Sequence, residues 1–335
     1  MKNDNYNRQN ADYEQQPQKP RKKKKRRHPI RKLLITLLIL VAAFGGLGIA
    51  MINSVFNKLE HIDTEVSKRP GAMQGEIVNI LLVGQDARSG QGAQRSDSMI
   101  LCSINKKTKK ISLISIMRDT YVQIPGYGGN KINAAFAYGG YDLLDQTIEE
   151  NFGVTIDANL EVDFEGFLAG MTAVGSLEIE LTAEEAAYMN ENSGLGIPSD
   201  DPNAVVEAWS LTEGKQLLTP SQLLCYSRMR YVGNSDWDRT DRQRKVISAA
   251  ISKVKHGHLF SGFKMVNGAA ASIATDMSKS GLYKIILPVV LNTGINSYQI
   301  PAEGTYIGDY VDGMACLIPD IQANRDLLQE YINAR

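Results

Sequence analysis

Hydrophobic and polar positions first separate one long uncharged segment from the rest of the chain. Residues 33–52 read LLITLLILVAAFGGLGIAMI and contain no charged side chain. A helix of about 20 residues covers roughly 30 Å, the thickness of the hydrocarbon core of a bilayer. A cleaved signal peptide usually has a shorter apolar region and a small-residue cleavage site, and the following Asn53-Ser54-Val55 offers no such site. The pattern therefore favours an uncleaved transmembrane helix over a signal peptide or a buried core helix.

Strand patterns follow in the next part of the chain. Residues 77–83 are nearly all apolar and β-branched, which is typical of a strand buried on both faces. Residues 98–104 and 110–116 are two more apolar runs, and the polar residues 105–109 between them indicate a hairpin. We therefore expect a mixed sheet with at least one antiparallel pair.

Helical patterns alternate with these strands. Leu144, Ile148 and Phe152 recur every fourth residue in a helix predicted over 133–151, which Gly153 should end. Thr182 with Glu185 forms a capping-box pattern that opens a second helix, Thr219-Pro220 marks the start of a third, and 238–256 is a fourth helical stretch. Residues 190–207 have the composition of a surface loop. Alternating strands and helices predict an α/β layered domain.

The domain organisation follows from these patterns. Residues 1–32 form a basic tail, 33–52 the transmembrane helix, and 53–75 a short stalk that ends at Pro70-Gly71. No internal repeat or second linker interrupts residues 76–335, so we expect them to form one large domain.

The distribution of charge predicts how the chain is oriented in the membrane. The whole chain has no net charge, but residues 1–32 carry 12 Lys or Arg against 3 acidic residues, including the unbroken basic run 21–27. The positive-inside rule places this tail in the cytoplasm and the body outside, as in a single-pass type II protein of the cell membrane. The basic run also suits anionic membrane lipid. It contains no interleaved aromatic residues, so nucleic-acid binding is not favoured.

The sequence also excludes several kinds of catalytic site. Its four histidines, His28, His61, His256 and His258, argue against Ser-His-Asp and Cys-His hydrolases and against histidine-bound zinc. There is no P-loop and no dinucleotide-binding glycine pattern. Three widely spaced cysteines form no disulfide framework. The S-x-x-K match at 103–106 lies across the expected hairpin turn, and we interpret it as chance.

Arginine and aspartate remain as the candidate site residues. The first group of them lies at predicted strand ends. These residues are Asp86, Arg88, Arg95, Asp97, Arg118 and Asp119. Ligands of α/β sheets bind where strand ends open into a crevice. Asp86 and Asp97 could converge on one hard cation such as Mg²⁺. Surface ion pairs at strand ends are the alternative reading.

A second arginine group follows later. Arg228 and Arg230 share a face if the chain is extended there, and Arg239 and Gln243 lie one helical turn apart. The same turns lead to Val246 and Ala250, so this pair should lie on a buried helix face, with Arg244 well off it. Convergent guanidinium groups at a helix N-terminus suit a diphosphate. An arginine–aspartate network is the alternative, with partners Asp236, Asp238 and Asp241.

In combination, these residues resemble the LytR-CpsA-Psr family. The matching stretches are 79–88 (NILLVGQDAR), 95–98 (RSDS), 115–119 (SIMRD), 131–140 (KINAAFAYGG), 226–230 (YSRMR) and 238–243 (DRTDRQ). Each stretch is weak by itself, whereas their shared order behind an N-terminal anchor is specific. Met117 departs from the family, which usually has proline at that position.

The resemblance implies an α-β-α fold and a phosphotransferase function. Family members transfer anionic glycopolymers, such as teichoic acid or capsule, from an undecaprenyl-pyrophosphate carrier to peptidoglycan. The resemblance implies Asp86 and Asp97 as ligands of Mg²⁺ or Mn²⁺. It implies pyrophosphate binding by Arg88, Arg118, Arg228, Arg230, Arg239 and Gln243, and we include Arg95 and Arg242 from the same motifs.

The chemistry of the residues is compatible with this reaction. Without a histidine at hand, an aspartate must take the proton of the attacking hydroxyl. Asp97 is the first candidate and Asp119 the second, and Arg118 should stabilise the charge that develops. Two other functions stay open, a polyprenyl-pyrophosphate pyrophosphatase and a non-catalytic envelope regulator or lipid-binding scaffold.

Overall fold

The computed structural model describes residues 50, 52–84, 98–197, 207–233, 235–256 and 267–333. The chain divides into two units, 1–48 and 49–335, and all the described residues belong to the second. This unit is built on a seven-stranded sheet. The strands in spatial order are β1 (Glu60–His61), β10 (Ile273–Thr275), β7 (Ala158–Val162), β2 (Ile77–Gly84), β3 (Ser98–Asn105), β4 (Lys110–Ile116) and β11 (Gly294–Ile300).

The sheet is mixed, as predicted. The strand pairs β1–β10, β2–β7 and β4–β11 are parallel, and the other three pairs are antiparallel. The predicted hairpin is formed by β3 and β4, and β3 also pairs with β2 along its whole length, from Ile77 opposite Asn105 to Gly84 opposite Ser98.

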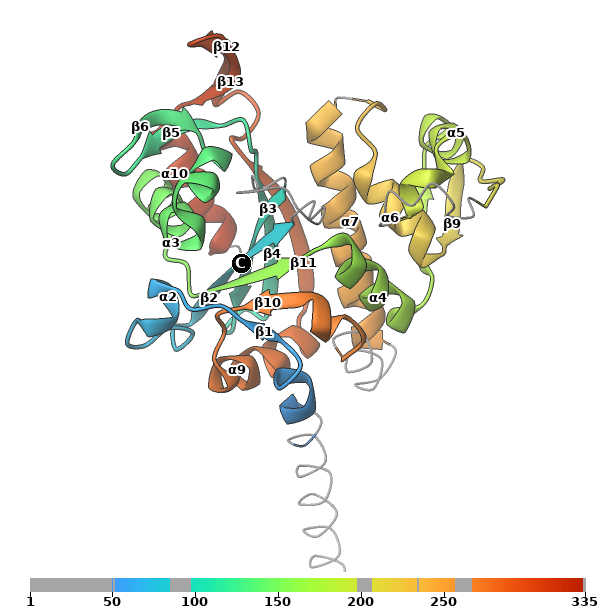
Figure 1. Ribbon diagram of the computed structural model, residues 1–335, viewed down its shortest axis with the longest axis horizontal. Helices are drawn as coiled ribbons and strands as arrows, with labels where there is room; N and C mark the ends of the chain where they lie inside the picture. Colours follow the sequence, from blue (N-terminus) through green and yellow to red (C-terminus); the bar gives the residue numbers. More distant parts are fainter. Residues whose placement is uncertain are drawn as a thin grey trace, which may run out of the picture. The chain divides into compact units, whose positions relative to one another are not determined.

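Alternate side chains of the central strands pack in two separate hydrophobic cores, one on each face of the sheet. Leu81 and Val83 of β2 pack in one core, and Val78 and Ile80 pack in the other. The first core includes residues of α3 (Asn133–Phe152) and α10 (Ile321–Ile332); the second includes residues of α9 (Lys279–Val290) and α7 (Ser235–His256). Helices therefore cover both faces of the sheet, which confirms the α-β-α arrangement (Figure 1).

The predicted helix signals act as expected. Leu144, Ile148 and Phe152 of α3 are completely buried, and Gly153 ends the helix with φ 66°, a left-handed conformation that glycine adopts without a steric cost. Capping boxes at Thr182 and Thr219 open α5 (Ala183–Glu191) and α6 (Pro220–Arg228). These helices form a third core together with α4 (Phe164–Val174), the hairpin of β8 (Leu177–Leu181) and β9 (Gly214–Leu218), and one face of α7.

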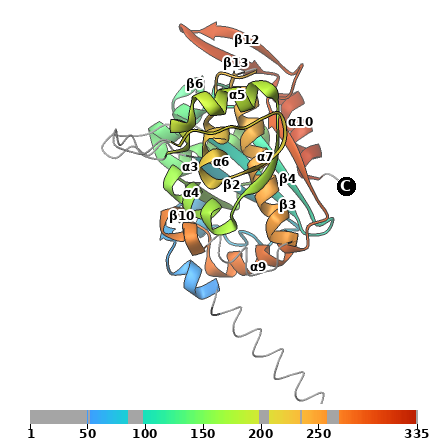
Figure 2. The same cartoon turned by 90° about the vertical axis from the view of Figure 1, so that its right-hand side faces the viewer.

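Two small hairpins lie at the end of the sheet where β4 finishes. They are β5 (Tyr121–Ile124) with β6 (Gly128–Lys131), and β12 (Tyr306–Val311) with β13 (Met314–Pro319). The two are joined by a bridge between Thr120 and Leu317, and both views show β12–β13 beside β6 (Figures 1 and 2). The remaining short elements are α2 (Glu65–Lys68) and the 3₁₀ turns η1 (Ser193–Gly196) and η2 (Ala270–Ser272).

The expected stalk requires a correction. Residues 60 and 61 form the edge strand β1 of the central sheet, and Val55, Val66 and Met73 are buried. Residues 53–75 are therefore an integral part of the folded unit and not a spacer. The expected transmembrane helix, 33–52, lies outside the described residues except for Ala50 and Ile52. In the described part of the chain, no helix is both long and apolar enough to span a bilayer.

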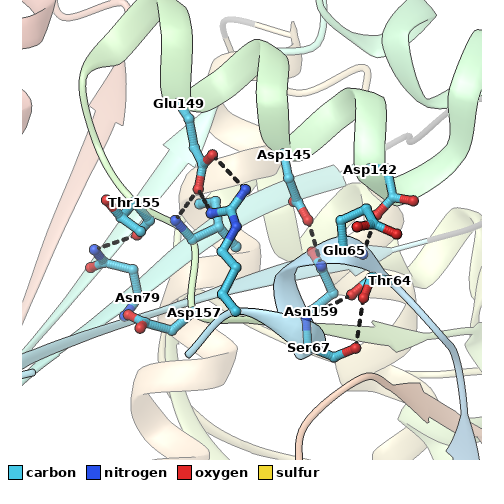
Figure 3. A network of polar contacts seen from close by, with 12 residues as sticks. Thr64, Glu65, Ser67, Asn79, Asp142, Asp145, Glu149, Thr155, Asp157 and Asn159 are labelled. Carbon is cyan, nitrogen blue, oxygen red and sulfur yellow. Dashed lines mark hydrogen bonds and ion pairs between the residues drawn. The ribbon is translucent and has the colours of Figure 1, made fainter. Parts of the chain in front are cut away.

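A polar network ties this N-terminal segment to α3 and to β7 (Figure 3). The guanidinium of Arg69 donates two hydrogen bonds to Glu149, and the backbone N–H of Met73 donates to Asp157. At its centre Asn159 donates from Nδ2 to Asp145 Oδ2, at 2.7 Å, and to Asp276 Oδ2, at 2.9 Å. Two buried carboxyl groups thus share one amide.

This arrangement predicts a pH-dependent stability. Burial, with the nearby Asp276 charge as a smaller cause, raises the pKa of Asp145 to about 8. The unfolded chain releases this proton near pH 4, so between roughly pH 4 and 8 the folded state binds the extra proton. The free energy of unfolding should therefore fall as pH rises through this range, by at most about 1.4 kcal/mol per pH unit from this group.

Denaturant titrations at several pH values test this expectation. Asp145→Asn should flatten the decline, because the side chain no longer titrates. Asp142→Asn is the matched control on the same helix, where the exposed Asp142 accepts a hydrogen bond from the Glu65 N–H. A decline that is unchanged in Asp145→Asn would assign the pH dependence to another group.

Candidate active site

Asp236 brings together two of the predicted arginines. One carboxylate oxygen, Oδ2, lies 3.1 Å from Nε and 3.0 Å from Nη2 of Arg118; the other, Oδ1, lies 3.1 Å from Nη1 of Arg239. Arg118 comes directly after β4 and Met117, and Asp236 and Arg239 lie in the first turns of α7. The end of a central strand and the N-terminus of a long helix therefore present two guanidinium groups side by side. Asp236 offsets the repulsion between them.

The predicted buried face of α7 is confirmed. Arg239 is only 3% exposed, and Val246 and Ala250 are buried in the third core. Arg239 and Ala250 therefore lie on the same face of the helix, Ala250 in the third core and Arg239 beside Asp236. The positive end of the helix dipole adds to the attraction for an anion at this point.

Gln243 lies on the same face and points to the start of β3. Its Oε1 accepts a hydrogen bond from the Ser98 hydroxyl, at 2.7 Å, and its Nε2 donates to the backbone oxygen of Ser227, at 3.4 Å. Ser98 directly follows Asp97, and Ser227 directly precedes Arg228. Gln243 therefore connects the first predicted group of charged residues with the second.

Arg228 and Arg230 are arranged differently from the prediction. Arg228 is the last residue of α6 and not part of an extended segment. Its guanidinium lies 4.4 Å from the ring centroid of Phe164, and Nη1 donates to the backbone oxygens of Leu195 and Ile197, both at 2.9 Å. Arg230 lies beyond the helix end and is exposed. The two side chains do not share the strand face that their spacing suggested.

Arg242 belongs to the protein interior and not to the arginine cluster. It is 3% exposed, its Nε donates to Glu185 at 2.8 Å, and Nη1 and Nη2 donate to the backbone oxygens of Met229 and Val232. A carboxylate and two carbonyls therefore engage this guanidinium. The inclusion of Arg242 among the pyrophosphate ligands is corrected on this ground.

Arg244 lies off the Arg239 face, as predicted, but it is also buried. Its guanidinium donates to the hydroxyl of Ser297 on β11, at 2.6 Å, and to that of Ser115 on β4, at 2.5 Å. Burial lowers the pKa of this group, and Asp241 acts in the opposite direction. Helical phase places Arg244 off the Arg239 face, but that side of α7 packs on the sheet.

Asp119 extends the cluster on the other side of Arg118. Its carboxylate lies 3.6 Å from Nε of Arg118 and accepts a hydrogen bond from Lys131 Nζ at 2.7 Å. Lys131 ends β6 opposite Tyr121, the first residue of β5, so the hairpin brings the lysine back near Asp119, two residues before Tyr121. Asp119 is thus placed between Arg118 and the β5–β6 hairpin.

The predicted residues Asp86, Arg88, Arg95 and Asp97 lie outside the described residues. Their flanks are nevertheless informative, because Gly84 and Ser98 are directly paired in the β2–β3 ladder. Asp86 is two residues from Gly84 along the chain, and Asp97 directly precedes Ser98. Within the described ranges no group of three or more His, Cys, Asp or Glu residues is suited to hold a metal.

Three residues that contact the predicted arginines or Asp119 are not among the site residues predicted from the sequence. Asp236 was considered only as part of an alternative arginine–aspartate network, and Lys131 and Phe164 were not considered as site residues. A signal existed for two of them. Asp236 precedes Arg239 by one helical turn, and the glycine-rich turn at 126–129 predicts a hairpin that returns Lys131 towards Asp119.

The sequence profile of the LytR_cpsA_psr family matches residues 49–332. The chain belongs to this family. Among curated relatives, it is 31% identical over 262 residues to a polyisoprenyl-teichoic acid–peptidoglycan teichoic acid transferase TagU of Enterococcus faecalis, covering 75% of this chain and 80% of that protein. It is 39% identical over 185 residues to TagU of Oceanobacillus iheyensis, covering 53% of this chain and only 52% of the relative. It is 29% identical to the regulatory protein MsrR of Staphylococcus aureus, covering 80% of each.

Solved structures of the family share the fold. TagT bound to LI-WTA superimposes with a TM-score of 0.63 at 25% identity, covering 79% of this chain and 93% of that chain. The LytR-CPS2A-psr family protein YwtF (TagT) with a bound octaprenyl pyrophosphate lipid superimposes with a TM-score of 0.60 at 23% identity, covering 79% and 94%. The family assignment and the α-β-α architecture of this chain are thus shown. Its own reaction is a separate question.

Proposed function

We propose that this family member is a phosphotransferase that moves an anionic glycopolymer from an undecaprenyl-pyrophosphate carrier to peptidoglycan. The observation that carries the proposal is the junction of Arg118 and Arg239 on Asp236, with Gln243 one turn along the same helix. Arginine binds phosphate oxygens through parallel N–H groups, and two adjacent guanidinium groups match the two phosphates of a diphosphate. The names of the TagU relatives and the lipid bound to TagT support the same reading.

Each residue then has a defined task. Arg118, Arg239 and Gln243 bind the diphosphate and stabilise the charge on the departing phosphate, and Arg88, Arg95, Arg228 and Arg230 are the further candidates around them. The acceptor hydroxyl forms the new bond to the phosphorus nearer the polymer, and the bond to the carrier phosphate breaks. Asp97 remains the candidate for taking the hydroxyl proton. Asp119 holds Lys131 and Arg118, which assigns it a positioning role with a reserve function as base.

The carboxylate oxygens of Asp86 and Asp97 are donors that suit a resident divalent cation. Asp86 and Asp97 would hold Mg²⁺ or Mn²⁺, which when bound supplies positive charge beside the phosphates. The basic tail and the uncharged segment 33–52 support a type II topology in the cell membrane, with the catalytic unit outside.

Transfer and hydrolysis are separated by one assay. Purified full chain in detergent is given a labelled polyprenyl-diphosphate sugar, with or without a peptidoglycan oligomer. We expect label in the oligomer and little free sugar phosphate when the acceptor is present. Release of sugar phosphate that is independent of the acceptor would identify a pyrophosphatase, and the absence of both products would favour a regulator or scaffold.

The same assay tests the metal. Asp86→Asn and Asp97→Asn keep the shape of the side chain and remove its charge, so Mg²⁺-dependent turnover should fall by about 100-fold or more while the thermal midpoint stays close to the parent value. Asp312→Asn, in the turn between β12 and β13, is the control. Full activity of both site variants in the presence of a chelator would contradict the assignment.

A further inference from the structure

Two tyrosines, one in the β5–β6 turn and one in α3, form an exposed aromatic pair. The rings of Tyr127 and Tyr138 stack with centroids 4.8 Å apart and an interplanar angle of 23°. They remain 59% and 44% exposed. Neither residue belongs to any of the three cores of the described unit. Two large rings held together in water bury little of the surface that normally stabilises a fold, so the pair calls for another explanation.

The backbone holds this pair in place from both sides. Tyr127 sits in the β5–β6 turn between Gly126, with φ 79°, and Gly128, with φ 81°. Tyr138 ends the first part of α3, where Gly139 and Gly140 leave helical geometry, and Gly140 has φ 62° and ψ −148°, a conformation essentially restricted to glycine. The Tyr138 hydroxyl also accepts a hydrogen bond from Nδ2 of Asn130, at 2.9 Å. The hairpin and the helix are thus fixed to each other through these rings.

A short chain of contacts leads from the pair to the arginine cluster. Asn130 is followed by Lys131, whose Nζ binds Asp119, and Asp119 lies beside Arg118. Arg239 approaches Arg118 through Asp236, whereas the tyrosines lie beyond Asp119. The tyrosine pair is therefore connected to Arg118 through Asn130, Lys131 and Asp119, and Arg239 is connected to it through Asp236.

The chemistry of the patch selects its ligand. Lys131, whose Nζ donates to Asp119, is the one charged residue in the stretch 120–141 that carries the two rings. An anionic polymer would call for cations here, whereas an uncharged sugar ring does not. The C–H groups on one face of a pyranose are weakly positive and pack against the negative face of an aromatic ring. Neighbouring amide and hydroxyl groups can bind the hydroxyls and acetamido groups of the sugar.

We propose that Tyr127 and Tyr138 bind a sugar ring of the acceptor, the glycan strand of peptidoglycan, and so present its hydroxyl at Asp119 and Arg118. This inference rests on the proposed function for the identity of the acceptor. It assigns to these tyrosines a role in acceptor binding and none in phosphate binding.

Binding and kinetics of the full chain in detergent test the proposal. The probes are purified peptidoglycan free of attached polymer and soluble glycan oligomers made from it. Tyr127→Leu and Tyr138→Leu should each weaken glycan binding about tenfold and raise the acceptor KM to the same extent, with kcat and the donor KM unchanged. Tyr127→Phe should retain parental binding, because it keeps the ring. Tyr310→Leu is the control, since Tyr310 is 73% exposed on the neighbouring hairpin.

The outcomes separate this inference from the proposed function. Parental glycan binding by both leucine variants would overturn the inference, whether or not the chain transfers polymer. A rise in the donor KM in place of the acceptor KM, or a loss of binding to anionic lipid vesicles in place of glycan, would also overturn it. Tyrosine-dependent glycan binding by a chain that transfers nothing would uphold the inference and refute the transferase.

Discussion

Arg239→Lys should lower transfer of the polymer by about 100-fold or more with little change in the thermal midpoint. Lysine keeps a positive charge beside Asp236 but loses the planar group that can bind Asp236 and a phosphate oxygen at the same time. Removing one well-placed donor to a developing charge typically costs two to three orders of magnitude in rate, about 2.7–4 kcal/mol. The measurement is the rate of labelled transfer together with a thermal unfolding scan of each purified variant.

The control for this variant must be chosen by burial and not by helical phase alone. Arg244 is unsuitable because it binds Ser115 and Ser297 in the interior. Lys245→Arg is suitable: Lys245 is 52% exposed and pairs with Asp241 on the surface of the same helix. Equal transfer rates in Arg239→Lys and Lys245→Arg would leave the diphosphate-binding role of Arg239 without support.

Glu185→Ala should destabilise the fold by about 3–5 kcal/mol. The change removes the carboxylate partner of Arg242, and a buried ion whose partner is lost costs about this much. Both side chains are almost fully enclosed, with exposures of 3% for Arg242 and 8% for Glu185. The substitution also removes one half of the capping box of α5. Equilibrium denaturation of the purified chain gives the difference directly.

An exposed ion pair of the same subregion gives the comparison. Glu178 and Lys215 lie on the β8–β9 hairpin at 3.2 Å and are 64% and 69% exposed. Glu178→Ala should change the free energy of unfolding by about 0–1 kcal/mol. If Glu185→Ala is as mild as Glu178→Ala, the internal role assigned to Arg242 is wrong, and its place among the phosphate ligands must be reconsidered.

The elements that sequence predicted well are those with a strong local signal. The strand at 77–83 has an apolar run that only a doubly covered sheet can bury, and the helix at 133–151 has four-residue spacing with a terminal glycine. Thr182 and Thr219 carry their capping partners within three residues. In each case the residues that decide the structure are neighbours in the chain, so no knowledge of the tertiary fold is required.

The roles of individual arginines depend on distant partners and could not be read in the same way. Arg239, Arg242 and Arg244 lie within six positions of one helix, yet each has a different partner. Arg239 faces the cluster with Arg118, Arg242 binds the internal carboxylate of Glu185, and Arg244 binds two serines of the sheet. Helical phase predicted the direction of Arg239 correctly. It could not show that α7 is covered on several sides, which is why Arg242 was misplaced and the burial of Arg244 was not predicted.

The predicted start of the folded domain at residue 76 was wrong for a related reason. Residues 53–75 are mixed in charge, and elements such as β1 and α2 are only two and four residues long, so no local pattern separates them from a linker. Their place is decided by long-range contacts, such as the pairing of Glu60 with Ala274 and the hydrogen bond from Thr64 Oγ1 to Asp276. Such contacts leave no periodic mark in the sequence.

The order of the strands along the chain determines when the edges of the central sheet are covered during synthesis. Both flanks of the four central strands, β7, β2, β3 and β4, are completed late, since β10 joins β7 and β1, and β11 joins β4. Until residues 273–300 have emerged from the ribosome, β4 and β7 each present an unpaired edge, which is a template for association with other chains. Such pairing across long stretches of sequence is also slow to form. A nascent or truncated chain that ends before residue 273 should therefore depend on chaperones, whereas a chain that includes β10 and β11 closes both edges with these two strands.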